Sequence, residues 1–154
     1  MSVFQRLTHI GLCVSDLARS RRFYCEGLGF AFEHELHVAG EPTDTLLRLR
    51  GTDLHAVYLM RDGVRIELLH FARPAAPASR TRVMNELGLT HLSFRVAAID
   101  AALAAVRAAG GRVLDDTVVR FPEFEAAAGM VADPDGQLIE LVQAPGDPAA
   151  PPRA

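Results

Sequence analysis

The sequence predicts an α+β fold built from two tandem βαβββ modules, because two different stretches each occur twice. Residues 8–14 and residues 90–96 both begin with Thr-His and continue as a largely apolar strand. Residues 62–69 and residues 135–142 both pass from an Asp-Gly turn into an apolar strand that carries one Glu. A supersecondary unit that recurs in this way indicates a duplicated module. Each module opens on a strand with a His and closes on a strand with a Glu.

The composition is that of an ordinary globular protein and excludes several classes of function. Of the 154 residues, 49% are hydrophobic and 23% are charged, and the net charge of −3 offers no basic surface for nucleic acid or an anionic membrane. No apolar run approaches the roughly 20 residues that span a bilayer, and the N-terminus lacks the pattern of a signal peptide. Two cysteines do not make a disulfide framework, so we expect a cytoplasmic location.

The first module, residues 1–71, is predicted to run strand, helix, strand, strand, strand, with a short helix inserted before the third strand. Ser15 or Asp16 suits the N-cap of the first helix, since a short polar side chain accepts a backbone N–H there. Gly27 suits the end of that helix. The expected elements are a strand over 3–14, a helix over 17–26, a strand over 30–38, a helix over 42–48, a strand over 54–60, a turn at 62–63 and a strand through Glu67.

The second module, residues 89–143, repeats this order after a linker over residues 72–88 that contains prolines and small residues. A helical turn over residues 80–87 is expected within the linker. The tail over residues 144–154 is rich in Pro and Ala and is predicted to be disordered. The expected elements are a strand over 92–96, a helix over 99–109, a strand starting at 112–114, and strands over 126–132 and 137–143, whereas the pattern over 117–125 favours no element.

Two His and two Glu occupy matching places in the two modules, and together they predict a metal site. They are His9, Glu67, His91 and Glu140. A carboxylate flanked by apolar residues has to be neutralised, paired or metal-bound, because desolvating a lone charge is unfavourable. Imidazole nitrogens with carboxylate oxygens suit Zn, Ni, Co, Mn or Fe(II). Pseudo-symmetry between the modules would bring the four side chains to a shared axis, with one divalent metal per site.

These features resemble those of the vicinal oxygen chelate superfamily, which includes glyoxalase I, methylmalonyl-CoA epimerase, extradiol dioxygenases and the bleomycin- and fosfomycin-resistance proteins. The resemblance covers nearly the whole chain from residue 3 to residue 143. It implies two modules that form an open eight-stranded barrel-like sheet around a metal cleft, a small-molecule substrate and a homodimer. The residues that carry it are 8–12, 14–17, 23–24, 27–30, 66–69, 88–92, 133–136 and 139–141.

Within this superfamily the four metal positions discriminate between reactions. The order His, Glu, His, Glu in glyoxalase I is matched by His9, Glu67, His91 and Glu140. Methylmalonyl-CoA epimerases commonly have Gln at the position of Glu67. Extradiol dioxygenases bind iron with two His and one Glu, and need no ligand at that position. The presence of Glu67 therefore favours the lyase and isomerase branch.

The resemblance to glyoxalase I implies proton transfer next to a carbonyl of a substrate that chelates the metal through two adjacent oxygens. The catalytic base is expected to be Glu140 or Glu67, with Glu140 favoured. Two alternatives stay open: an Fe(II)-dependent extradiol-type dioxygenase, and a non-catalytic protein that binds a small molecule or confers resistance. The remaining histidines are expected on strand faces or loops rather than on the metal; they are His34, His37, His55 and His70.

Overall fold

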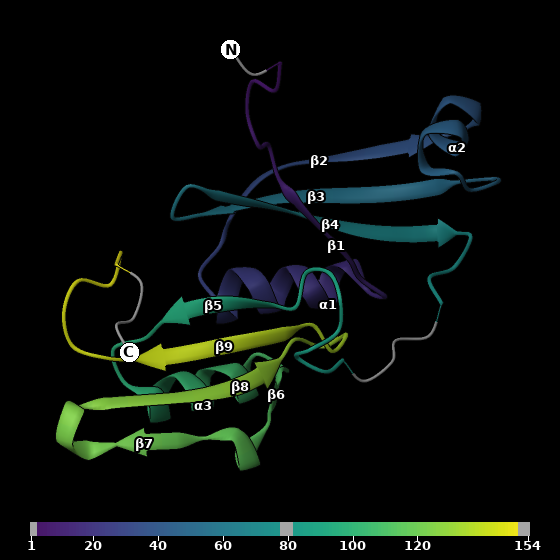
Figure 1. Ribbon diagram of the computed structural model, residues 1–154. Coiled ribbons are helices and arrows are strands. Elements are labelled where there is room, and N and C mark those ends of the chain that lie inside the picture. The colour runs from purple at the N-terminus through teal and green to yellow at the C-terminus, as the bar shows by residue number, and fades with distance from the viewer. Residues whose placement is uncertain (1–2, 78–81, 151–154) are drawn as a thin grey trace. The chain divides into compact units, whose positions relative to one another are not determined.

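The computed structural model describes residues 3–77 and 82–150. The chain divides into two compact units, Met1–Ala78 and Ser79–Ala154. Each unit contains a mixed sheet with helices against it (Figure 1). The predicted α+β class is confirmed, with two sheets and few helices.

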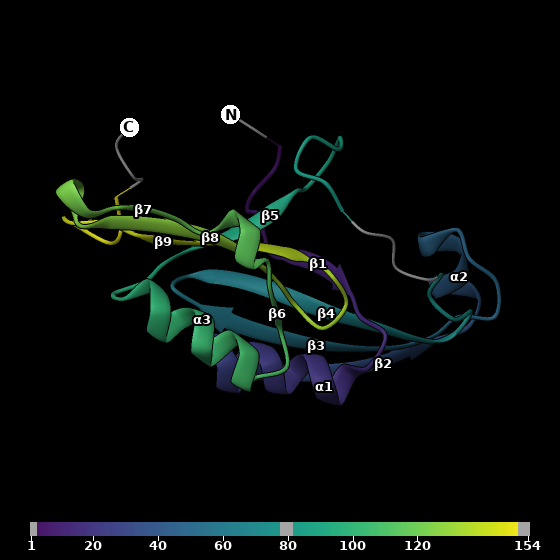
Figure 2. The same cartoon turned by 90° about the horizontal axis from the view of Figure 1, so that it is seen from below.

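The sheet of the first unit has the order β1-β4-β3-β2, in which β1 runs parallel to β4 and the other neighbours are antiparallel. Helix α1 packs on β3 and β4 (Figures 1 and 2), whereas α2 lies in the connection from β2 to β3. A π-helical turn follows α1 directly. The elements are β1 (Ile10–Cys13), α1 (Leu17–Arg22), the π-helical turn η1 (Phe23–Gly27), β2 (Ala31–Ala39), α2 (Glu41–Leu47), β3 (Asp53–Arg61) and β4 (Val64–Arg73).

Alternation along β4 separates the core of the first unit from its candidate site. Ile66 and Leu68 are fully buried, and their register partners on β3, Leu59 and Val57, are buried with them. Because successive side chains of a strand point to opposite faces, Glu67 points away from this core. The same pattern that buries the apolar side chains therefore presents the carboxylate on the other face of the sheet.

The sheet of the second unit has the order β5-β9-β8-β6, with β7 also paired to β8 and β5 parallel to β9. Helix α3 packs on β6, β8 and β9. Among the helices that the structure describes, none has the length and apolar character needed to cross a bilayer. The elements are β5 (His91–Arg95), α3 (Ile99–Ala108), β6 (Arg112–Val113), the 3-10 turn η2 (Asp115–Thr117), β7 (Val119–Phe121), the 3-10 turn η3 (Pro122–Phe124), β8 (Ala126–Ala132) and β9 (Leu138–Gln143).

The sequence assigned no element to residues 117–125, and in the structure the strand next to β8 is interrupted just before this segment. The interrupted strand consists of two pieces, β6 and β7, which pair with opposite ends of β8 and are separated by the 3-10 turn η2. Thr117 bridges the gap, since its hydroxyl donates to the carbonyl of Leu114 at 2.7 Å and accepts the N–H of Met130 at 2.8 Å. A side chain therefore replaces part of the backbone ladder.

The predicted first strand over residues 3–14 is wrong for its first part, because the structure has a strand only over Ile10–Cys13. The neighbouring strand β4 begins at Val64, and Ile66 is the register partner of Ile10. Residues 3–7 therefore extend beyond the end of the strand that would have to pair with them. Their apolar side chains stay exposed, as Val3 is 89% accessible.

Two further expectations concern segments that the structure describes only in part. Of the predicted helical turn over residues 80–87, residues 80–81 lie outside the described residues, and residues 82–87 form turns and bends without a helix. Of the predicted disordered tail, residues 144–150 form bends and turns, whereas residues 151–154 lie outside the described residues.

Of the two predicted N-cap residues, Ser15 and Asp16, the structure has Asp16 at the N-cap of α1, and this residue makes the stability of the first unit depend on pH. Its carboxylate accepts the N–H of Arg19 at 2.9 Å, and this hydrogen bond lowers the pKa of Asp16 below the ordinary value of 3.8. A lowered pKa means that the stabilisation is present above pH 3.8 and is lost as the pH falls through the lower value of the folded state.

We therefore expect Asp16→Ala to lower the melting temperature at neutral pH, and the difference from the wild type to shrink below pH 3.8. Thermal unfolding followed by circular dichroism at a series of pH values measures both effects. Asp16→Asn is the matched control, because its amide oxygen accepts the same N–H but does not titrate. An alanine variant as stable as the wild type at neutral pH would show that the cap contributes nothing.

Candidate metal centre

The first unit brings His9 and Glu67 together, as the sequence predicts for two ligands of one metal. His9 lies directly before β1, and Glu67 lies on the adjacent parallel strand β4. Nε2 of His9 is 3.0 Å from Oε2 of Glu67. The side chains are 35% and 12% exposed, so the pair faces accessible space from a half-buried position.

The second unit repeats this pair with His91 and Glu140. His91 is the first residue of β5, and Glu140 lies on the adjacent parallel strand β9. Nε2 of His91 is 3.8 Å from Oε2 of Glu140, and the side chains are 28% and 35% exposed. Ile139 and Leu141 are buried on either side of Glu140, and alternation directs this carboxylate to the opposite face of the strand from these two side chains.

A threonine hydroxyl contacts the other ring nitrogen of each histidine. Oγ1 of Thr8 lies 3.1 Å from Nδ1 of His9, and Oγ1 of Thr90 lies 2.9 Å from Nδ1 of His91. When Nδ1 carries the proton and donates it to the threonine, the lone pair of Nε2 is free to bind a metal. Both histidines are therefore held with the same nitrogen directed at the carboxylate.

In each unit a side chain on or next to the glutamate strand donates a hydrogen bond to the backbone of the threonine. The donor is Arg65 on β4 in the first unit and Gln137, directly before β9, in the second. Arg65 donates to the carbonyl oxygen of Thr8 at 3.3 Å and forms a two-pronged ion pair with Glu33, at 2.5 and 3.1 Å. Gln137 donates to the carbonyl oxygen of Thr90 at 3.1 Å. These contacts tie the histidine segment to the glutamate strand in both units.

The two carboxylates differ in the hydroxyl group that is their second partner. For Glu67 it is the hydroxyl of Tyr58. The ring of Tyr58 also meets that of His9 edge-on, with centroids 5.5 Å apart. Burial, followed by the hydrogen bond and charge of Glu67, raises the pKa of Tyr58 to about 12, so this phenol stays protonated as a donor. Glu140 instead accepts the hydroxyl of Ser93 at 2.7 Å. Glu67 is thus the more enclosed carboxylate and Glu140 the more accessible one.

The distances within each pair fit ligands of a divalent cation. Two ligand atoms at about 2.1 Å from one metal ion are about 3.0–3.4 Å apart in octahedral or tetrahedral geometry. The separations of 3.0 Å and 3.8 Å lie near this range. The structure determines each unit by itself, so the convergence of both pairs on a single ion remains a prediction.

Valine in place of Thr8 or Thr90 is expected to weaken metal binding by roughly 10- to 100-fold, because valine keeps the shape but cannot hold the Nδ1 proton. Competition with a chelating dye measures the change in dissociation constant. Thr45→Val is the matched control, since Thr45 is exposed on α2. Unchanged affinity in both site variants would mean that the threonines do not orient the imidazoles.

The four histidines that were expected away from the metal all lie on strands of the first unit. His34 on β2 stacks on Tyr58, with ring centroids 4.4 Å apart, and so lies beside the first pair. His70 on β4 has Nδ1 3.3 Å from the carbonyl oxygen of Val14. His37 and His55 lie elsewhere on the sheet, next to a different carboxylate.

Comparison with known proteins assigns the chain to a family. The model of the Glyoxalase/Bleomycin resistance protein/Dioxygenase superfamily matches residues 6–141, which include both His–Glu pairs. The chain belongs to this superfamily. The resemblance to the vicinal oxygen chelate superfamily that the sequence predicts is thereby confirmed. The superfamily unites enzymes with resistance proteins, so membership alone does not name the reaction.

Three individual proteins resemble the chain along nearly its whole length. The uncharacterized protein YaeR of Escherichia coli is 31% identical over 90% of this chain and 96% of its own. A glyoxalase family protein from Bacillus cereus has the same fold, with a TM-score of 0.79 at 23% identity over 94% and 97% of the two chains. The fosfomycin resistance protein FosX of Listeria monocytogenes, solved with Mn(II) and sulfate, gives a TM-score of 0.60 at 17% identity over 93% and 95%.

Proposed function

We propose that this member of the glyoxalase superfamily is a metal-dependent lyase or isomerase that moves a proton next to a carbonyl group. The observation that supports it most is the repetition of one arrangement, Thr–His facing Glu, in both units. The proposed ligands of one divalent ion are His9, Glu67, His91 and Glu140. The Mn(II) in the FosX structure supports a divalent metal in this fold.

The donor set fits such an ion, since two imidazole nitrogens and two carboxylates suit divalent Zn, Ni, Co, Mn and Fe. When bound, the ion would supply Lewis acidity toward a small substrate with two adjacent oxygens. His9 and His91 would hold their Nε2 atoms in place through the threonines behind them. Glu67, which is the more enclosed carboxylate, is assigned to binding.

Glu140 is assigned as the base that takes the proton from the carbon next to the carbonyl and returns it to the neighbouring atom. Its side chain is 35% exposed, against 12% for Glu67, so a substrate reaches it more readily. The hydroxyl of Ser93, 2.7 Å from Oε2, orients the carboxylate. A carboxylate placed in this way contributes roughly 10²–10⁴-fold to the rate.

Exchange of a substrate proton with solvent tests this proposal. Metal-loaded protein in D₂O is offered hemithioacetals of 2-oxoaldehydes and small 2-hydroxy ketones, and deuterium next to the carbonyl is followed by ¹H NMR. Incorporation that disappears with a chelator and returns with a divalent metal is the expected result. No exchange with any of these compounds, at full metal occupancy, would contradict proton transfer.

Oxygen uptake with catechols, measured on Fe(II)-loaded protein, separates the proposal from an extradiol-type dioxygenase. That reaction needs His9, His91 and Glu140 but not Glu67, so Glu67→Gln would retain its metal and its activity. Under the lyase or isomerase proposal the same variant loses metal. A protein purified without chelators that holds no metal would instead favour a non-catalytic small-molecule binder.

The assembly and location of the protein follow from the same proposal. We infer a homodimer, because each sheet is open and leaves edge strands such as β2 to be covered. Light scattering of the purified protein measures the oligomeric state directly. A cytoplasmic location, as the sequence predicts, suits a metal enzyme that acts on small carbonyl compounds.

A further inference from the structure

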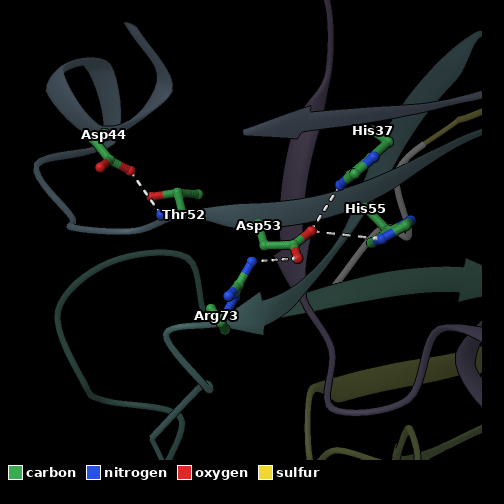
Figure 3. A network of polar contacts seen from close by, with 6 residues as sticks. All are labelled: His37, Asp44, Thr52, Asp53, His55 and Arg73. Carbon is green, nitrogen blue, oxygen red and sulfur yellow. Dashed lines mark hydrogen bonds and ion pairs between the residues drawn. The ribbon is translucent and has the colours of Figure 1, made fainter. Parts of the chain in front are cut away.

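A second group of metal-binding side chains lies in the first unit, apart from the proposed catalytic ligands. Among residues 3–77 and 82–150, the group of three or more such residues whose ligand atoms all lie within 4.8 Å of one another is His37, Asp53 and His55. Figure 3 shows both imidazoles directed at the carboxylate of Asp53. Nε2 of His37 is 2.7 Å, and Nε2 of His55 is 3.7 Å, from Oδ1 of Asp53.

The strand register brings these three residues together. His37 on β2 and His55 on β3 are direct partners in the antiparallel ladder, and their rings stack with centroids 4.2 Å apart. Directly paired residues of antiparallel strands lie on the same face. Asp53 is two residues before His55 on the same strand, which again places it on that face.

This group lies on the opposite face of the sheet from Glu67. Tyr58 is the register partner of Glu67, whereas His55 is the partner of His70. His55 and Tyr58 are three residues apart on β3 and therefore point to opposite faces. An ion held by the group of His37, Asp53 and His55 would consequently be separate from one held by His9 and Glu67.

The surroundings of Asp53 hold its carboxylate in place. Asp44 of α2 accepts the backbone N–H groups of Gly51 and Thr52 at 2.8 and 2.7 Å, which fixes the turn that leads into Asp53. Arg73 donates to Oδ2 of Asp53 at 3.2 Å (Figure 3). Oδ1 is thereby left facing the two imidazoles.

We propose that His37, Asp53 and His55 form a surface site for a divalent transition-metal ion such as Zn(II) or Ni(II). The ion is bound by Nε2 of both histidines and Oδ1 of the aspartate, and water completes its coordination. Ligand atoms of a tetrahedral zinc site are about 3.4 Å apart, a value that the 2.7 and 3.7 Å contacts bracket. Imidazole with carboxylate is a donor set that these metals favour. The proposal is independent of the reaction assigned to the other site.

Calorimetric titration of the metal-stripped, untagged full-length protein with ZnCl₂ tests the proposal. The wild type is expected to show two binding events. His37→Asn/His55→Asn removes the event of the surface site, and Glu67→Gln/Glu140→Gln leaves that event in place but removes the event of the proposed catalytic site. If the catalytic proposal fails, only the second event is missing, so the two proposals are tested separately. His70→Asn, in the same row of histidines, is the matched control and keeps both events.

Two additional measurements make the outcome specific to these residues. Long-range ¹H–¹⁵N NMR spectra should show the Nε2 signals of His37 and His55 shifting on addition of Zn(II). Arg73→Gln should bind Zn(II) several-fold more tightly, because it removes a positive charge beside the site. Zinc binding of equal stoichiometry and affinity in the wild type and in His37→Asn/His55→Asn would overturn the proposal.

Discussion

Glu140→Gln is expected to slow the proposed proton transfer by roughly 10²–10⁴-fold at full metal occupancy, because an amide cannot accept the proton. The substitution keeps the size of the side chain and its contact with Ser93. The measurement is the initial rate of deuterium incorporation, with metal content determined on the same samples. The metal is added at a saturating concentration, so that weaker metal binding by the variant is not mistaken for a slower proton-transfer step.

Glu35→Gln is the matched control for this prediction, because Glu35 is 66% exposed on β2 and belongs to neither His–Glu pair. Its rate should equal that of the wild type. A Glu140→Gln variant that holds its metal and exchanges protons at the wild-type rate would remove Glu140 as the base. If Glu67→Gln alone lost the reaction while keeping its metal, the base would be Glu67.

His9→Asn is expected to weaken metal binding by more than about 100-fold, which exceeds the roughly 10- to 100-fold effect of an outer-shell partner. Asparagine has no imidazole nitrogen to offer at the position of Nε2. Elemental analysis of stripped and reloaded protein, together with dye competition, measures the loss. His91→Asn should behave in the same way, since His91 contacts Thr90 and Glu140 as His9 contacts Thr8 and Glu67.

His70→Asn serves as the control for a lost histidine on the same sheet, because Nδ1 of His70 contacts a backbone carbonyl rather than a carboxylate. It should bind metal as the wild type does. If His9→Asn and His91→Asn both kept wild-type affinity, the two histidines would not be ligands. Unfolding curves of all three variants exclude the loss of fold as the cause.

The repeated sequence predicted most of what positions the candidate site. Apolar residues flank Glu67 and Glu140 on both sides, which predicts a strand at each place, and the structure has strands there. The Asp16 cap was predictable because its hydrogen bond is local. The family resemblance rested on the same local features, and the family match bears it out.

Features that depend on pairing between distant strands were not predictable from the sequence. Residues 3–9 have the composition of a strand, but β4 starts too late to pair with most of them. The break between β6 and β7 depends on Thr117 and its contact with Met130, thirteen residues away. The partnership of His37 with His55 depends on the β2–β3 register across the inserted α2.

The role of the threonines next to both histidines was not predicted from the sequence for a different reason. Thr8 and Thr90 belong to the repeated stretch, so their recurrence was visible, but their role was not assigned. The contact with Nδ1 depends on the rotamer of each histidine, which a sequence pattern does not specify. The repetition of a threonine directly before each proposed histidine ligand was the sequence signal from which this role could have been predicted.

The number of ions bound per chain tests the central claim most directly, namely that His9 and Glu67 share one ion with His91 and Glu140. The titration is made in a His37→Asn/His55→Asn background, which removes the surface site. One ion per chain is expected, and it should be lost both in His9→Asn/Glu67→Gln and in His91→Asn/Glu140→Gln. Two ions per chain, each lost only with its own pair, would contradict a shared metal.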